Sequence, residues 1–401
     1  MYSRLAVGRS IASCLPQDQV SRFAARPAPR GAVQWEAVAA PEYDLIFAGG
    51  GLSALLLLRE LRGELSGRVA IVDPVQPLEQ APVHWSYWSK GPTLYDRFAL
   101  GVWRRARVAG KPPEPLAPYA MRLVRSTDVL AHLVESLRTA PIEWIRAEAT
   151  SISRRHDGLY EVATDEGALH ARWVFDSALG VSPAFPSTGQ PRAALSGTGI
   201  RVVSDRSAFD PATATLFDPL DEKSFAYLLP LSPTEALLES ASFGPARKTD
   251  ERPLLQYLRE RHPGAGFTVT HTEGCSIPLG FAPAKTSGPR HVLLGTKRGL
   301  VKPSAGYGIV RIAEESRHLA RLWREGISPP PTRRPSWRWR LLDRGFLQLA
   351  AHDPRLPLAL LRRVMGAVPL VQSLRFIDED LPPRQLASVF RSAAPVVLAR
   401  R

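Results

Sequence analysis

Six residues around position 50 constrain the fold more than any other feature of the chain. Gly49-Gly50-Gly51-Leu52-Ser53-Ala54 fits the pattern G-x-G-x-x-G/A, in which glycines permit a tight turn and close approach to a phosphate. The pattern follows an apolar run over residues 44–48 and opens a helical pattern that reaches Leu61. A second apolar run, residues 69–72, ends at Asp73. This β-turn-α-β succession predicts the start of a parallel, doubly wound sheet.

Each part of the pattern has a role in holding a dinucleotide. Gly49 would make the turn, Gly51 would let the backbone approach a pyrophosphate at the helix N-terminus, and Ala54 would allow close helix–strand packing. Asp73 could accept hydrogen bonds from ribose hydroxyls, and an acidic residue there disfavours a 2′-phosphate. We therefore expect FAD or NAD rather than NADP. The alternative is a glycine-rich turn that binds no nucleotide.

A second glycine-rich segment lies far downstream. A short apolar strand ends at Gly295, and the chain passes Gly299, Pro303 and Gly306 before a helical pattern over residues 310–323. A late strand–glycine–helix segment that returns to the same nucleotide suits a large flavin, so these four residues are candidate cofactor contacts. The alternative is an ordinary strand-to-helix loop.

The charge balance points to a polyanionic partner. Basic residues number 52 and acidic residues 38, a formal net charge of +14, which suits nucleic acid or an anionic membrane surface. The segment from Arg333 and Arg334 through Trp337 to Arg338 and Arg340 alternates Arg with Trp, which favours a membrane surface. No nucleic-acid-binding motif is present, so we expect no nucleic-acid partner. The alternative is a solvated basic linker whose Trp residues belong to the core.

Cysteine usage and hydropathy restrict the location of the protein. Cys14 and Cys275 form no CxxC pair, so we expect neither a disulfide framework nor a metal site. No apolar run approaches the roughly 18 residues of a spanning helix, and no secretory signal follows the N-terminus. We expect a cytoplasmic protein that associates peripherally with a membrane.

Eight segments, taken in order along nearly the whole chain from Tyr43, carry a family resemblance. They are Asp44–Ala54, His84–Trp88, Val174–Asp176, Leu216–Asp218, Tyr227–Ser232, Ala236–Glu239, Glu273–Gly274 with Ile277–Leu279, and Gly299–Tyr307. Together they resemble the FAD-dependent lycopene cyclases of carotenoid biosynthesis. The resemblance implies reduced FAD, with NAD(P)H as its reductant, and closure of the linear ψ-ends of a lycopene-like polyene into rings with no net redox change. It also implies that Asp176 contacts the cofactor.

The resemblance also selects the residues for chemistry. Glu239 is the candidate acid, because it ends an apolar strand segment where burial would raise its pKa and keep it protonated. Asp218 is a candidate second carboxylate. The alternatives are an exposed residue of an alternating strand for Glu239 and a turn residue before Pro219 for Asp218.

Four aromatic residues are candidates for the substrate pocket: Trp85, Tyr87, Trp88 and Tyr227. Their π-faces could stabilise a carbocation, and plain core packing is the alternative.

The chain departs from the family pattern at one informative point. The family follows the first acid of its acidic strand with a second acid and Thr, whereas Ser240 and Ala241 stand here. Two other functions therefore stay open: a flavin-dependent oxidoreductase or hydroxylase of the same fold, and a non-catalytic carotenoid-binding relative.

These observations predict an α/β chain in which a Rossmann-type FAD-binding domain is interrupted by an antiparallel-sheet substrate domain and followed by C-terminal helices. We expect a poorly ordered N-terminal extension over residues 1–42. The predicted FAD-binding domain comprises residues 43–80, 121–190 and 288–328. The predicted substrate-binding and helical region comprises residues 81–120, 191–287 and 329–401, of which 81–120 looks irregular.

Overall fold

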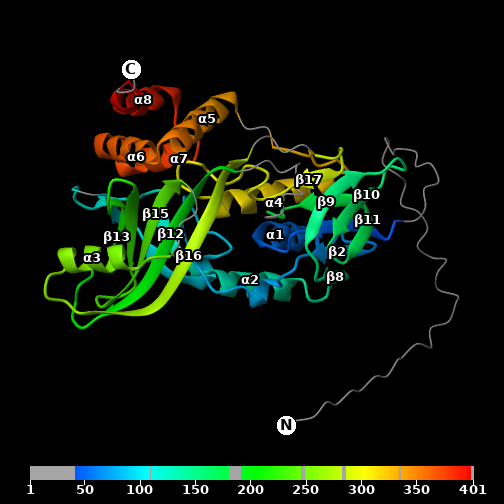
Figure 1. Cartoon of the computed structure of the whole chain (residues 1–401), viewed down its shortest axis with the longest axis horizontal. Helices are drawn as coiled ribbons and strands as arrows, with labels where there is room; N and C mark the ends of the chain where they lie inside the picture. The colour runs from blue at the N-terminus through cyan, green and yellow to red at the C-terminus, as the bar shows by residue number, and fades with distance from the viewer. Residues whose placement is uncertain are drawn as a thin grey trace, which may run out of the picture. The chain divides into compact units, whose positions relative to one another are not determined.

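The computed structural model describes residues 41–108, 110–179, 191–244, 249–281, 286–333 and 336–398 (Figure 1). The N-terminal extension that we expected over residues 1–42 lies outside the described residues, apart from its last two. Arg334 of the basic segment also lies outside them.

The first sheet is the Rossmann-type sheet, with strand order β8-β2-β1-β11-β10-β9 and β17 paired to β11. Strands β8, β2, β1, β11 and β17 are parallel neighbours, and β9 and β10 are antiparallel. The strands are β1 (Tyr43–Ala48), β2 (Val69–Val72), β8 (Ile142–Ile145), β9 (Ala149–Arg154), β10 (Tyr160–Thr164), β11 (Gly167–Asp176) and β17 (His291–Leu293). Its helices are α1 (Leu52–Leu61), α2 (Ser126–Ser136) and α4 (Ile309–Arg324), with a 3₁₀ turn η2 (Pro77–Glu79).

Strand β1 is apolar throughout because both of its faces are covered. Leu45 and Phe47 pack into the cluster that contains α1, and Ile46 and Ala48 pack into the opposite cluster with β9 and β10. Parallel strands buried on both faces read as continuous apolar runs, which is the signal that predicted this strand. The β-turn-α-β prediction is thus confirmed, and β9 is a strand that the sequence pattern did not reveal.

The second sheet is mainly antiparallel, with strand order β16-β12-β15-β14-β13-β5-β6. Its strands are β5 (Arg105–Arg107), β6 (Glu114–Pro115), β12 (Pro191–Ser204), β13 (Thr213–Pro219), β14 (Ser224–Pro230), β15 (Glu235–Gly244) and β16 (Phe267–Phe281). Helix α3 (Arg252–Arg261) packs on one face with Ile200, Leu228 and Leu238. Side chains alternate between faces along a strand, so Leu237 and Glu239 point to the other face. The expected antiparallel sheet is confirmed.

A third, three-stranded sheet has the order β3-β7-β4, with β3 (His84–Ser89), β4 (Ala99–Trp103) and β7 (Ala120–Arg125), and a 3₁₀ turn η3 (Asp96–Phe98). Residues 81–120, which looked irregular in sequence, therefore contain strands of two sheets. The sequence did not reveal β5 because it pairs with residues 213–215 of β13, which are more than 100 residues away in the chain, and a local pattern cannot indicate such a contact.

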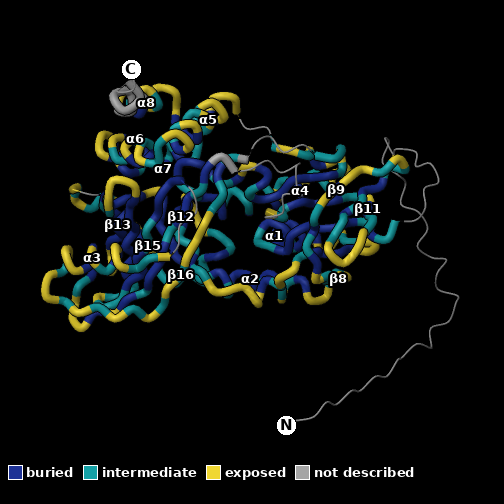
Figure 2. Tube along the Cα trace, viewed as in Figure 1, coloured by how far each residue is buried: buried dark blue, intermediate teal, exposed yellow. Residues whose placement is uncertain are grey.

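Four helices follow the second half of the Rossmann-type domain: α5 (Trp337–His352), α6 (Arg355–Ala367), α7 (Leu370–Ile377) and α8 (Pro383–Leu398). Helices α5 and α6 pack against strands of the second sheet, where Phe346 contacts Phe243 with ring centroids 5.2 Å apart. Figure 2 shows exposed positions along α3, α5 and α6 and buried positions along the strands beneath them. Among the described residues, no helix combines the length and apolar character needed to cross a bilayer.

Candidate functional site

A cavity of about 340 Å³ lies between the first turn of α1 and the second sheet. Leu52 of α1 borders it on one side, and Glu239 of β15 on the other. Most of its wall is apolar, including Met121, Leu195, Ile277, Val301, Ile309 and Ile312. Residues 49–54, which fit G-x-G-x-x-G/A, are called the nucleotide fingerprint below. The cavity therefore extends from this fingerprint to the candidate acid and is largely apolar.

Glu239 faces this cavity from an apolar strand. Its neighbours in sequence, Leu237 and Leu238, are fully buried, while Glu239 keeps intermediate exposure where it borders the cavity. Ser86 of β3 donates a hydrogen bond to Glu239 Oε2 at 2.9 Å. Burial raises the pKa of Glu239 to about 7, against the opposing effect of the Ser86 hydrogen bond, and the charge of Glu273 raises it further. A carboxyl with this pKa is available as a proton donor near neutral pH.

A second carboxylate, Glu273 of β16, borders the same cavity. Gly199 of β12 pairs with Glu239 on one side and with Glu273 on the other, so the two acids flank one glycine across three adjacent strands. A Cβ at position 199 would lie 2.8 Å from Glu273 Cγ, which explains why glycine stands there. The sequence analysis did not select Glu273 as a site residue, although it begins one of the segments that carried the resemblance.

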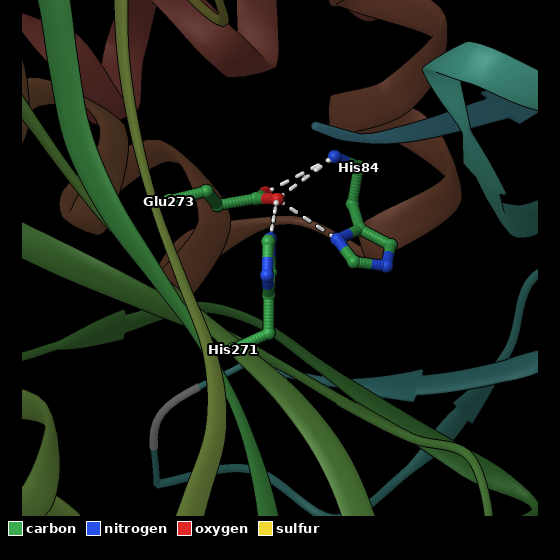
Figure 3. A group of neighbouring side chains, drawn as sticks. All are labelled: His84, His271 and Glu273. Atoms are coloured by element: carbon green, nitrogen blue, oxygen red, sulfur yellow. Dashed lines mark hydrogen bonds and ion pairs between the residues drawn. The ribbon is translucent and has the colours of Figure 1, made fainter. Parts of the chain in front are cut away.

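Two histidines hold the Glu273 carboxylate (Figure 3). His84 Nδ1 lies 2.9 Å and His271 Nε2 lies 3.2 Å from Glu273 Oε2. The backbone N–H of His84 donates to both carboxylate oxygens at 3.1 Å. Sequence reasoning missed both histidines and Ser86. The available signal was the alternation of β3, which puts His84, Ser86 and Trp88 on one face.

The same three side chains have the chemistry of metal ligands. One ligand atom from each of His84, His271 and Glu273 lies within 4.8 Å of the others. In the present arrangement these atoms are hydrogen-bonded to one another. The sequence analysis predicted no metal site, and that stays a prediction.

The four predicted pocket aromatics separate into two groups. Trp85, Trp88 and Tyr227 border the cavity, whereas Tyr87 is buried against Tyr95 outside it. Trp88 stacks on Tyr307 with centroids 4.5 Å apart, and the Tyr307 hydroxyl donates to the Trp88 carbonyl. Burial, and then the charge of Glu239, raise the pKa of Tyr227 well above its usual value, so this phenol stays protonated.

Asp218 is not brought to the cavity. It is fully buried on the face of the sheet that α3 covers, where Tyr257 donates a hydrogen bond to it and Arg261 Nη2 lies 2.7 Å away. The structure therefore separates the two predicted carboxylates, Glu239 and Asp218, on opposite faces of one sheet.

Ser240, at the position of the missing second acid, is held by β12. The Thr198 N–H donates to Ser240 Oγ at 3.1 Å, and Ser240 Oγ lies 3.3 Å from the Thr198 carbonyl. Ser240 borders the same cavity as Glu239, but because side chains alternate along β15 the side chain of Ser240 leaves the opposite face of the strand.

The fingerprint residues lie at the turn from β1 to α1, with Asp73 directly after β2, and their contact with a dinucleotide stays a prediction. Gly49 has a φ of +91°, and a Cβ there would lie 2.6 Å from Ser177 Oγ. At Gly51, which precedes the first turn of α1, a Cβ would meet no protein atom within 4 Å, so space is free above the helix N-terminus. Ala54 is fully buried. Asp73 ends β2 and accepts hydrogen bonds from the Gly50 N–H at 2.7 Å and the Val75 N–H at 2.9 Å.

The other predicted cofactor residues occupy the late segment of the same domain. Gly295, with a φ of +54°, closely approaches Ser53 of α1. Gly306 borders the cavity, Gly299 has a φ of +75°, and Pro303 is buried between them. The structure thus returns this segment to the fingerprint helix.

Asp176 lies at the end of β11, beside β1, but its carboxylate is already bonded. Lys297 Nζ lies 2.6 Å and His291 Nε2 3.1 Å from Asp176 Oδ2. Burial opposes ionisation, but the His291 hydrogen bond and the Lys297 charge hold the pKa of Asp176 below its usual range. The Asp176 side chain thus connects β11 to the glycine-rich segment that contains Gly295. Its contact with a cofactor stays a prediction.

The chain matches a family model described as lycopene cyclase protein over residues 44–399. Among curated protein sequences, none matches the chain.

Several solved structures share the fold at low identity. The halogenase PltM is 14% identical with a TM-score of 0.56, over 90% of this chain and 92% of the halogenase. A geranylgeranyl bacteriochlorophyll reductase-like protein from Thermoplasma acidophilum is 12% identical with a TM-score of 0.52, over 88% of this chain and 96% of that protein. CtdE, solved in complex with FAD and a substrate, is 11% identical with a TM-score of 0.52, over 89% of this chain and 99% of CtdE. The shared architecture is a Rossmann-type flavoprotein fold.

Proposed function

The chain belongs to the lycopene cyclase family, and on that premise we propose that it closes the linear end groups of a lycopene-like polyene into rings. The observation that carries the proposal is Glu239, a carboxyl with a pKa of about 7 that faces a largely apolar cavity. Acid-initiated ring closure needs such a group to protonate an alkene, and it needs an apolar space that keeps water from the carbocation.

We propose FAD as the cofactor, because the residues fit it. The free space above Gly51 and the uncapped N-terminus of α1, which has no acidic residue in its first turn, suit a pyrophosphate. Leu52 and Gly306 border the cavity between that helix and Glu239, so they would help to hold the flavin. Bound in reduced form, with NAD(P)H as the reductant, the flavin would supply negative charge beside the developing cation.

The side chains of this chain account for the initial step. Glu239 delivers a proton to the terminal alkene, and its own negative charge then remains close to the cation. The hydroxyl of Ser86 orients the Glu239 carboxyl through the 2.9 Å hydrogen bond. The rings of Trp88 and Tyr227 give the cation π-density, and together with Trp85 these residues form part of the wall that excludes water from the cavity.

Expression in cells that accumulate lycopene tests this function. A cyclised product with the mass of lycopene supports it. A product with added oxygen or lost hydrogen would instead support a flavin-dependent oxidoreductase or hydroxylase, and unchanged lycopene with a flavin-loaded protein would support a non-catalytic carotenoid-binding relative.

Substitution of the acid provides the second half of that test. We expect Glu239→Gln to lower ring formation by about 10²–10⁴-fold, because Gln keeps the size of the side chain but cannot deliver the proton. Flavin content should not change. Glu235→Gln is the matched control, because Glu235 lies on the same strand but pairs with Arg201 at 2.6 Å outside this cavity. Ring formation by Glu239→Gln at the rate of the unchanged protein would eliminate Glu239 as the acid.

A further inference from the structure

The cavity holds two carboxyl groups in opposite environments. Glu239 receives one hydrogen bond, from Ser86, and burial raises its pKa. Glu273 accepts a hydrogen bond from the backbone N–H of His84, the ring nitrogens of His84 and His271 lie beside its carboxylate, and its side chain is 8% exposed. Two carboxyl groups that border one cavity in such different surroundings have the arrangement expected of an acid and a base in one active site.

Their spacing keeps the two groups separate. Glu239, Gly199 and Glu273 are in register on β15, β12 and β16, so two strand spacings, roughly 9.5 Å in all, separate the two backbones. Gly199 has no side chain, and the side chain of Glu273 lies over it, so close that an added Cβ would come within 2.8 Å of Glu273 Cγ. Glu239 and Glu273 both border the cavity, so a polyene end held there can meet both carboxyl groups.

We propose that Glu273 is the catalytic base that removes the proton which ends ring closure. This inference rests on the proposed function. Glu239 transfers a proton to the terminal alkene, a second alkene attacks the cation to form the ring C–C bond, and Glu273 takes a proton from a carbon next to the new cation. That C–H electron pair forms the ring double bond, so the product is an isomer of the substrate. Glu239 ends ionised and Glu273 protonated, and one proton must return to Glu239 through solvent water.

The structure gives Glu273 a route to solvent. His84 borders both the cavity and a second cavity of about 580 Å³, and His271 borders the second one. The side chain of His271 is 33% exposed, so it can pass a proton from Glu273 to water. The titratable and charged groups around Glu273 are His84, His271, Glu239 and Cys275, with Arg125, Arg201 and Glu235 on the second cavity.

Deuterium labelling separates the base from the acid. The flavin-loaded, full-length protein would be given lycopene in vesicles in D₂O, and product and recovered substrate would be analysed by mass and absorption. Unchanged protein should add one deuterium per ring formed. Glu239→Gln should give neither rings nor deuterium. Glu273→Gln should lower ring formation by at least about 10²-fold. It should still place deuterium in recovered lycopene, because the cation gains a deuteron and can re-form the alkene by losing one of its original C–H protons.

Two outcomes with Glu273→Gln protein that retains its flavin would overturn the proposal. One is ring formation at the unchanged rate, and the other is loss of rings together with loss of deuterium exchange. Glu260→Gln, at an exposed position of α3 that borders neither cavity, is the control here and should match the unchanged protein. If the unchanged protein forms no rings, the proposed function itself fails, which is a different result.

A second variant tests the proposal should Glu273→Gln fail to fold. Glu273→Asp keeps a carboxyl group beside His84 and His271 but shortens the side chain by one carbon. It should form rings more slowly than the unchanged protein and still place deuterium in recovered lycopene. Loss of rings together with loss of that exchange, in protein that retains its flavin, would contradict a base at Glu273.

Discussion

At the scale of single residues, the site depends on its glycines as much as on its reactive side chains. Gly49 and Gly51 stand two positions apart in the fingerprint, yet their surroundings differ. The backbone at Gly49 is left-handed and crowded by Ser177, whereas the space at Gly51 is empty of protein atoms. The first glycine serves the fold, and the second leaves room for a ligand.

Paired substitutions test this division. Gly51→Val should abolish flavin retention, because its side chain would fill the proposed pyrophosphate space, and the melting temperature of the flavin-free protein should not change. Gly49→Ala should destabilise the protein itself, by about 1–3 kcal/mol, through strain at a positive φ. Flavin absorbance after purification and thermal unfolding of the flavin-free forms measure the two effects. Stoichiometric flavin in Gly51→Val would show that the site is misplaced.

The pKa of Glu239 predicts a pH dependence. The protonated form is the active one, so the rate should be sustained below about pH 7 and fall as pH rises through the pKa of about 7. Well above that value the fall should approach tenfold per pH unit. Ring formation by the flavin-loaded protein at saturating substrate, followed between about pH 6 and 9, gives the profile. A rate that rises through this range would exclude Glu239 as a donor.

At the scale of elements, the first turn of α5 exposes two large apolar side chains. Trp337 and Leu341 are 67% and 63% exposed and stand one helical turn apart. Arg338 and Arg340 are exposed beside them, while Trp339 is buried. From the sequence, the Trp residues of this segment could either contact a membrane or pack in the core. In the structure Trp339 packs in the core and Trp337 is exposed. An exposed apolar pair flanked by arginines suits the surface of an anionic membrane.

We propose that this turn attaches the protein peripherally to the membrane that holds the polyene. Replacing Trp337 and Leu341 with Ser should weaken sedimentation with anionic vesicles through lost apolar contact. Replacing Arg338 and Arg340 with Gln should weaken it by about 1 kcal/mol per residue, and more so at low salt. Arg344→Gln is the control for a general loss of charge, because Arg344 is exposed one turn further along α5. Equal binding by all variants would exclude this turn as the attachment site.

At the scale of the whole molecule, local patterns predicted the elements whose signals are local. The fingerprint, the apolar strands beside it and the helix over residues 310–323 all depend on residues close in sequence, and the structure contains them. The short strands β4, β5 and β6 escaped prediction, because their own sequences are too short to show a period and because β5 also pairs with β13, which is distant in the chain.

The candidate site was predictable to a similar extent. Glu239 stands out in an apolar strand, so a local reading finds it. Glu273 joins it only because β12 lies between β15 and β16, and no local pattern reports that order. Asp218 looked like a second acid in the sequence, but the alternation of its strand turns it toward α3. Tertiary placement, rather than residue type, decides which carboxyl groups meet.

Gly199 has a consequence for how such enzymes can vary through evolution. Most positions in a strand accept several residues, and active-site positions are usually sought among those with reactive groups. Position 199 has no reactive group, yet even one added carbon would press against Glu273. Natural variation should therefore be as restricted at this glycine as at the acids themselves, and a survey that looks only for reactive side chains would overlook it.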